Sequence, residues 1–201
     1  MKKLSVLMFA LLLATVACNT NSGENHVKVD FAIYETVMVQ DLPSSPTTAH
    51  PALTAEGANL VLNKDPGSAI VAYAHVDSTF SIDTPVENQM KFLRTAQPVD
   101  PEQQYYAIVA VKTQPVMTGS DLKTTKANKN NVEISFNLKG ARKWAEMTRN
   151  NIGKTIAITI DDRVYALPTV MAEIREGRAM ISGLENEETA VKISAVLNKS
   201  L

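Results

Sequence analysis

The chain has 201 residues, of which 45% are apolar and 20% are charged, and its formal net charge is -1. This composition is typical of a globular domain, and it lacks the basic excess that most nucleic-acid-binding proteins carry. The single cysteine excludes an intramolecular disulfide and a zinc site built on several cysteines.

The start of the chain has the pattern of a secretory signal peptide. Lys2 and Lys3 precede an apolar run from Leu4 to Ala17, which is shorter than the about 20 residues of a membrane-spanning helix. The run leads into Cys18, and the segment Thr15-Val16-Ala17-Cys18 resembles the lipobox of bacterial lipoproteins, with threonine where leucine is usual. We therefore expect residues 1–17 to be a lipoprotein signal peptide and Cys18 to carry the lipid. The alternative is an ordinary signal peptide followed by a free or buried cysteine.

The rest of the chain is predicted to be a flexible tether, residues 18–26, followed by one domain, residues 27–201. Alternating apolar residues predict a strand over Val27 to Val39. The next part is rich in proline, and its pattern is less regular. It is predicted to contain a loop at 41–57, a helix or a strand at 58–62, a strand at 69–75, and irregular chain at 83–104 with a helical turn near 87–94.

From Tyr105 onward the hydrophobic patterns are clearer. They predict a strand at 105–113, a turn at 115–121 with a short helix after it, a strand at 132–136 and a helix ending near 150. A hairpin follows, with strands at 155–160 and 164–170 around Asp161-Asp162-Arg163. The last predicted elements are a strand at 178–181 and a helix after Asn186. Strands and helices interleave and hairpins are present. We therefore expect an α+β fold, with a mixed or antiparallel sheet and helices packed mainly on one face.

Two helices have recognisable ends. Asn137 is a suitable N-cap for the first, and Gly153 follows it as a stop in the left-handed conformation. Trp144 falls on the inner face of this helix, so it is either a core residue, the preferred interpretation, or an aromatic residue of a binding groove. Asn186 is the expected cap of the last helix, whose inner face is predicted to be Ala190, Ile193, Val196 and Leu197.

Several segments, in order and almost without gaps, resemble one known family. They are Pro115 to Leu122, Ile134 to Phe136, Gly140 to Thr148, Asn151 to Lys154, Ile158 to Asp161, Ala166 to Pro168, and Gly177 to Gly183. Through them, residues 105–198 resemble the head subdomain of the first periplasmic domain of SecD, a membrane protein that assists bacterial protein export. Residues 31–37 resemble the opening strand of that head, and residues 41–104 match weakly. Asp162-Arg163 stands where the family usually has Gly-Lys, and no segment resembles the membrane helices of SecD.

The sequence contains no recognisable catalytic or metal-binding motif. The three histidines are far apart, and no glycine-rich phosphate loop or nucleophile elbow is present. Asp161 and Asp162 could form an acid-base pair, but adjacent residues of a hairpin turn are more often solvent-facing. We therefore expect no cofactor, no metal and no catalytic residue. Met171 and Met180 flank the segment 173–177. Core packing is the preferred interpretation of both, and the alternative is that they bind a protein partner through adaptable apolar contacts.

The resemblance and the lipobox together imply a non-enzymatic, lipid-anchored protein of the cell envelope. It is expected to be tethered to a membrane by lipidated Cys18, outside the cytoplasm, on the periplasmic or the surface face. Its expected partners are exported polypeptides or components of the translocon, and no nucleic acid. The alternative is a structural or adaptor lipoprotein that binds one specific folded partner and has no part in export.

Overall fold

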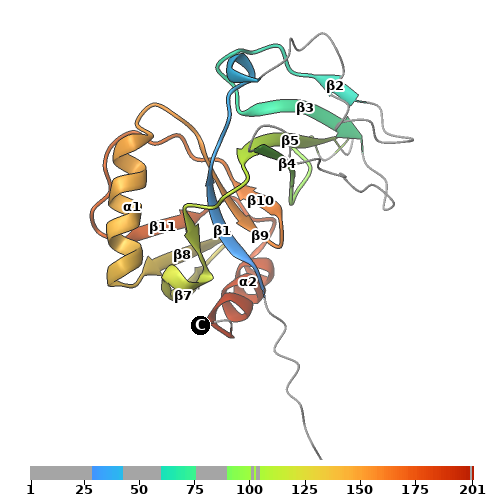
Figure 1. Cartoon of the computed structure of the whole chain (residues 1–201). Coiled ribbons are helices and arrows are strands. Elements are labelled where there is room, and N and C mark those ends of the chain that lie inside the picture. Colours follow the sequence, from blue (N-terminus) through green and yellow to red (C-terminus); the bar gives the residue numbers. More distant parts are fainter. Residues whose placement is uncertain (1–28, 43–59, 76–89, 101, 103–104, 200) are drawn as a thin grey trace, which may run out of the picture.

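The computed structural model describes residues 29–42, 60–75, 90–100, 102, 105–199 and 201. Cys18, the tether at 18–26 and most of the predicted loop at 41–57 lie outside these residues. The described chain forms one eight-stranded sheet, one three-stranded sheet and two α-helices (Figure 1). The helices are α1 (Leu138–Asn150) and α2 (Glu187–Lys199).

The three-stranded sheet is antiparallel and has the order β11-β8-β7. Its strands are β7 (Leu122–Asn128), β8 (Asn131–Phe136) and β11 (Arg178–Ile181). Val132, Ile134 and Phe136 of β8 share a core cluster with residues of both helices, including Trp144 and Leu197. The other face carries polar side chains such as Lys126 and Glu133. Both helices therefore contact one face of this sheet, which confirms the predicted α+β arrangement.

The larger sheet is mixed, with the order β2-β3-β5-β4-β10-β9-β1-β6. Its strands are β1 (Phe31–Glu35), β2 (Leu60–Leu62), β3 (Ile70–His75), β4 (Met90–Thr95), β5 (Tyr105–Lys112), β6 (Met117–Thr118), β9 (Ile156–Ile160) and β10 (Arg163–Ala166). All its strand pairs are antiparallel except β4 with β10.

Five strands of the larger sheet close into a ring. β5, β4, β10, β9 and β1 are successive neighbours, and the bridge between Thr36 and Val111 brings the end of β1 back to β5. The Val37 N–H also donates to the Ala110 carbonyl at 2.9 Å. Small side chains such as Ala32 and Ala157 point into the ring together with Val109 and Val111. Their neighbours on β1 and β9 point into the main core, so both strands are buried on two faces.

The structure confirms most of the predicted elements from Tyr105 onward. The Asn137 side chain accepts the Gly140 N–H at 2.9 Å and caps α1. The Asn186 side chain accepts the Thr189 N–H at 2.9 Å at the start of α2. Gly153 has φ +81°, as expected for the stop after α1.

The hairpin between β9 and β10 turns on two aspartates. Asp161 and Asp162 have φ of 49° and 56°, which is the pattern of a type I′ turn. Arg163 already belongs to β10. The predicted hairpin is confirmed, and two aspartates adopt the left-handed conformation that glycine or asparagine more often occupies.

Three predictions of local structure are wrong. Residues 90–95 form strand β4 and not a helical turn, because β5 and β10 pair with the segment from both sides. Leu122 begins strand β7 and not a short helix; a single 3-10 turn, η3 (Gly119–Asp121), precedes it. On α2, Ala190 and Leu197 are buried as predicted, but Ser194 is buried in place of Val196, which is 38% exposed. The undecided segment at 58–62 contains strand β2.

Candidate functional site

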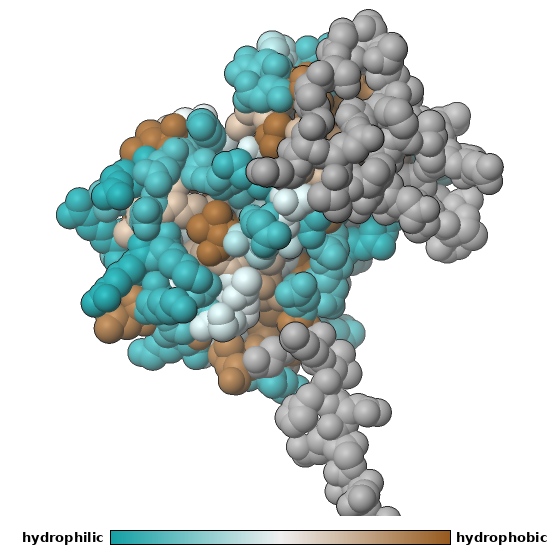
Figure 2. Space-filling view, viewed as in Figure 1, coloured by the Kyte–Doolittle hydropathy of each residue, from teal (hydrophilic) through white to brown (hydrophobic). Residues whose placement is uncertain are grey.

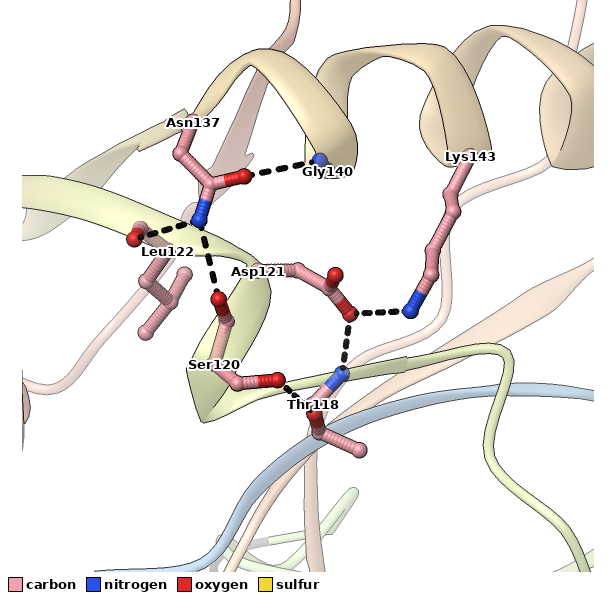
Figure 3. Close-up of polar contacts among 7 residues, drawn as sticks. All are labelled: Thr118, Ser120, Asp121, Leu122, Asn137, Gly140 and Lys143. Atoms are coloured by element: carbon pink, nitrogen blue, oxygen red, sulfur yellow. Dashed lines mark hydrogen bonds and ion pairs between the residues drawn. The ribbon is translucent and has the colours of Figure 1, made fainter.

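The first candidate region is the turn between β6 and β7. Asp121 lies at the centre of this turn and is only 1% exposed. One carboxylate oxygen, Oδ2, accepts the Thr118 N–H at 3.0 Å and pairs with Lys143 Nζ of α1 at 2.8 Å (Figure 3). The other, Oδ1, is buried with no hydrogen-bond partner among the residues that the structure describes. The ion pair and the Thr118 N–H therefore satisfy one oxygen of this buried carboxylate.

The start of α1 is fastened to the same turn. The Asn137 side-chain amide donates to the Ser120 carbonyl at 2.9 Å and to the Leu122 carbonyl at 3.3 Å, while its oxygen caps the helix (Figure 3). Gly140 lies so close to the turn that an added Cβ would be 2.3 Å from the Asp121 carbonyl oxygen. The turn and the first turn of α1 therefore form one rigid unit, in which only glycine fits at the contact.

A groove of about 510 Å³ lies beside this turn. It is lined by Val29, Asp30, Thr118, Gly119, Ser120, Leu122 and Leu201. Its lining mixes apolar side chains with the hydroxyls of Thr118 and Ser120, which are 2.9 Å apart.

Met171 and Met180 are both on the surface. Met171 is 82% exposed and Met180 is 48% exposed, so the preferred interpretation, that they pack in the core, is wrong. Met180 lies on β11, with Glu133 as its cross-strand neighbour. Met171 follows Val170, whose carbonyl accepts the Gly153 N–H at 2.8 Å. Figure 2 shows that the face seen there is mainly hydrophilic, with apolar residues in separate spots.

Trp144 belongs to the core. It is 3% exposed, and its ring lies 5.4 Å from that of Phe136. Burial in the shared cluster of the two helices and both sheets leaves no aromatic surface for a ligand. The core interpretation of Trp144 is confirmed.

The two aspartates of the β9–β10 turn have structural partners. Asp161 accepts the Asp30 N–H at 2.9 Å, and Asp162 pairs with Lys91 at 2.6 Å. Burial lowers the pKa of Lys91, but hydrogen bonds to Asp162 and the Tyr34 hydroxyl outweigh it, so that the pKa is raised above its usual value. Lys91 is therefore charged at neutral pH, and the pair joins the turn to β4. Within the described ranges, no cluster of three or more His, Cys, Asp or Glu residues could hold a metal ion.

Two features of this region have no local signal in the sequence. Asp121 and Lys143 are 22 residues apart and meet only because α1 folds back over the turn. The segments 153–156 and 168–170 are joined by backbone hydrogen bonds, which fix the chain on either side of the β9–β10 hairpin. In the sequence, the glycine at position 140 inside the predicted helix is the one feature that suggests a close contact between this helix and another segment.

The fold and this turn describe an α+β domain in which both helices contact one face of a small antiparallel sheet. A family model described as SecDF, P1 head subdomain matches residues 91–200. The chain belongs to this family, which confirms the resemblance. Over the part of the chain that the structure describes, no helix is long and apolar enough to span a membrane.

Several known proteins are similar to this chain. The protein translocase subunit SecD of Rhodothermus marinus is 37% identical over 116 residues, which cover 54% of this chain and 19% of that protein. The protein translocase subunit SecDF of Thermus thermophilus is 41% identical over 88 residues, which cover 41% of this chain and 12% of that protein. A crystal structure of SecDF in a super-membrane-facing form is 36% identical, covers 51% of this chain and 14% of that chain, and has a TM-score of 0.43. The chain thus spans less than a fifth of the length of these relatives.

Proposed function

We propose that this chain is a non-enzymatic, lipid-anchored protein of the cell envelope whose head domain binds exported polypeptides or components of the translocon. The observation that carries the proposal is the family match over residues 91–200, together with relatives that are themselves translocase subunits. The exposed methionines provide adaptable apolar contacts of the kind that suits varied polypeptides.

The proposed anchor is a lipid on Cys18. The lipobox-like segment before it and the short polar tether after it support this role. Cys18→Ser is expected to release the protein from washed membranes into the soluble fraction. A variant that stays with the membranes as fully as the parent chain would contradict the lipid anchor.

Crosslinking in cells tests the proposed partners. A photo-reactive residue is placed in turn at Met171, Arg175 and Lys123, all exposed, and captured proteins are identified by mass spectrometry. A probe at the exposed Lys64, between β2 and β3, serves as the matched control. Many exported proteins, or translocon subunits, captured above the control would support the proposal. One recurrent folded envelope protein without exported proteins would instead indicate an adaptor, and the export role would be wrong.

A further inference from the structure

Strand β11 is an open edge of the three-stranded sheet. Among the described strands, the sheet order places β8 on one side of β11 and no strand on the other. The Phe136 N–H donates to the Gly177 carbonyl at 2.9 Å, so the ladder to β8 uses residues 177, 179 and 181. The intervening Arg178 and Met180 therefore direct their backbone N–H and C=O groups away from β8. No residue in the described part of the chain forms a hydrogen bond with these groups.

The opposite edge of the same sheet is closed. On β7, the Thr125 N–H donates to the side-chain oxygen of Asn198 at 2.8 Å, and the Asn198 amide donates to the Thr125 carbonyl at 2.9 Å. The Thr125 hydroxyl also contacts Ser194 of α2. Helix α2 thus protects β7 in the way that proteins usually protect an edge strand. β11, 4 residues long and with exposed side chains, has no such cover from a described residue.

We infer that the open edge of β11 binds an extended polypeptide segment by β-strand addition, with Arg178 and Met180 supplying the backbone donors and acceptors. This inference rests on the proposed function, and it names how that site would bind an exported chain. Backbone pairing does not depend on the sequence of the guest. It therefore fits a domain that handles many unfolded chains better than a pocket for one side chain would.

The dimensions of the edge favour this occupant over a second copy of the chain. Only two residues point outward, so the edge offers few hydrogen bonds and a small contact area. A stable dimer needs about 1,200–2,000 Å² of buried surface, far more than a strand of 4 residues provides. Weak, reversible pairing is what the transient capture of a moving chain requires. Met180, 48% exposed beside the edge, can adapt to differing guest side chains.

Met180→Pro in the full chain tests the backbone contact. Proline removes the outward N–H of residue 180 but no hydrogen bond to β8, and edge strands tolerate proline at such a position. Met180→Thr is the matched control, since it changes the side chain and keeps the N–H. The probe is a fluorescein-labelled peptide of alternating valine and serine with a lysine at each end, and binding is measured by fluorescence anisotropy. Met180→Pro is expected to weaken binding about fivefold, the effect of one net hydrogen bond, and Met180→Thr less than about twofold.

A second measurement leaves the protein unchanged, so it does not depend on the folding of the variant. The same peptide is prepared with N-methyl groups on every residue, or on every second residue. Full methylation blocks both edges of the guest strand and is expected to abolish binding, whereas alternate methylation leaves one edge free and is expected to preserve it.

The outcomes separate the two proposals. If the methylated peptides and Met180→Pro bind as well as their parents, edge pairing is wrong, while the proposed binding of unfolded chains stands. If the parent chain does not bind the unmodified peptide, edge pairing and the proposed binding of unfolded chains are both wrong, and of the proposed partners only components of the translocon are left. If sedimentation shows a dimer that Met180→Pro dissociates, and the peptide does not compete with it, the occupant is a second copy and the inference is overturned.

Discussion

Replacement of Gly140 by alanine distinguishes the effect of helix propensity on stability from the effect of the tertiary contact with Asp121. Gly140 lies in the first turn of α1, where alanine is normally better than glycine by up to about 1 kcal/mol. Here an added Cβ would lie 2.3 Å from the Asp121 carbonyl oxygen and 2.9 Å from the Asp121 Cβ. Both distances are shorter than a van der Waals contact, and the carbonyl belongs to backbone that cannot rotate away. The η3 turn or the helix must shift.

The cost follows from what that shift disturbs. Overpacking of a close contact costs about 1–3 kcal/mol. Displacement of the turn also weakens the Asp121–Lys143 pair and the hydrogen bond from Asn137 to the Ser120 carbonyl, each worth about 1 kcal/mol or more. Against the small gain in propensity, we expect Gly140→Ala to lower the free energy of unfolding by about 1–3 kcal/mol. For a domain of this size the melting temperature would fall by about 2–4 °C per kcal/mol.

The matched control is Gly119→Ala, in the same turn. No atom lies within 4 Å of the Cβ that this change adds, so we expect a change within about 0.5 kcal/mol. Urea unfolding followed by circular dichroism measures both variants. If Gly140→Ala is as stable as the parent chain, or more stable, then helix propensity dominates and the close contact with Asp121 is not limiting.

Two further predictions concern other contacts between distant segments. Burial raises the pKa of Glu35, but hydrogen bonds from Asn151 and Lys112 outweigh it and lower the pKa below its usual value. The stabilisation from Glu35 is therefore complete at neutral pH and is lost as the pH falls through the lowered pKa. Urea unfolding of Glu35→Gln should therefore show a deficit at pH 7 that shrinks toward pH 3; a deficit independent of pH would contradict this reasoning. Asn198→Ala removes both hydrogen bonds that close the β7 edge at Thr125, and we expect a loss of about 1–2 kcal/mol in unfolding free energy. A loss no larger than that of an exposed control, Lys199→Ala, would show that the edge needs no such cover.

The part of the fold predicted from the sequence is the part with local physical signals. The Asn137 and Asn186 caps, the Gly153 stop and the β9–β10 hairpin each depend on residues within a few positions of one another. Such contacts are made whatever the rest of the chain does, so composition and spacing are enough to predict them. The family resemblance of residues 105–198 rests on the same well-patterned region, and the match over 91–200 confirms it.

The errors fall where a distant strand decides the conformation. Residues 90–95 have no strict alternation, and they form β4 because β5 pairs with one side and β10, in parallel, with the other. Leu122 to Asn128 becomes a strand through pairing with β8 and cover by α2. In both segments local propensity is weak, and tertiary hydrogen bonding outweighs it.

The candidate surfaces divide in the same way. By itself the sequence determined the composition class, the lipobox-like start, the helix ends and the residues that could serve a partner, Met171 and Met180 among them. Only the tertiary structure decided that these two methionines are exposed and that Asp121 is buried against Lys143. It also decided that α2 closes one edge of the small sheet, while no described strand pairs with the outer side of β11. Exposure, and the pairing of one edge with another, depend on contacts between residues far apart in the chain, and no local pattern of residues specifies which of those contacts form.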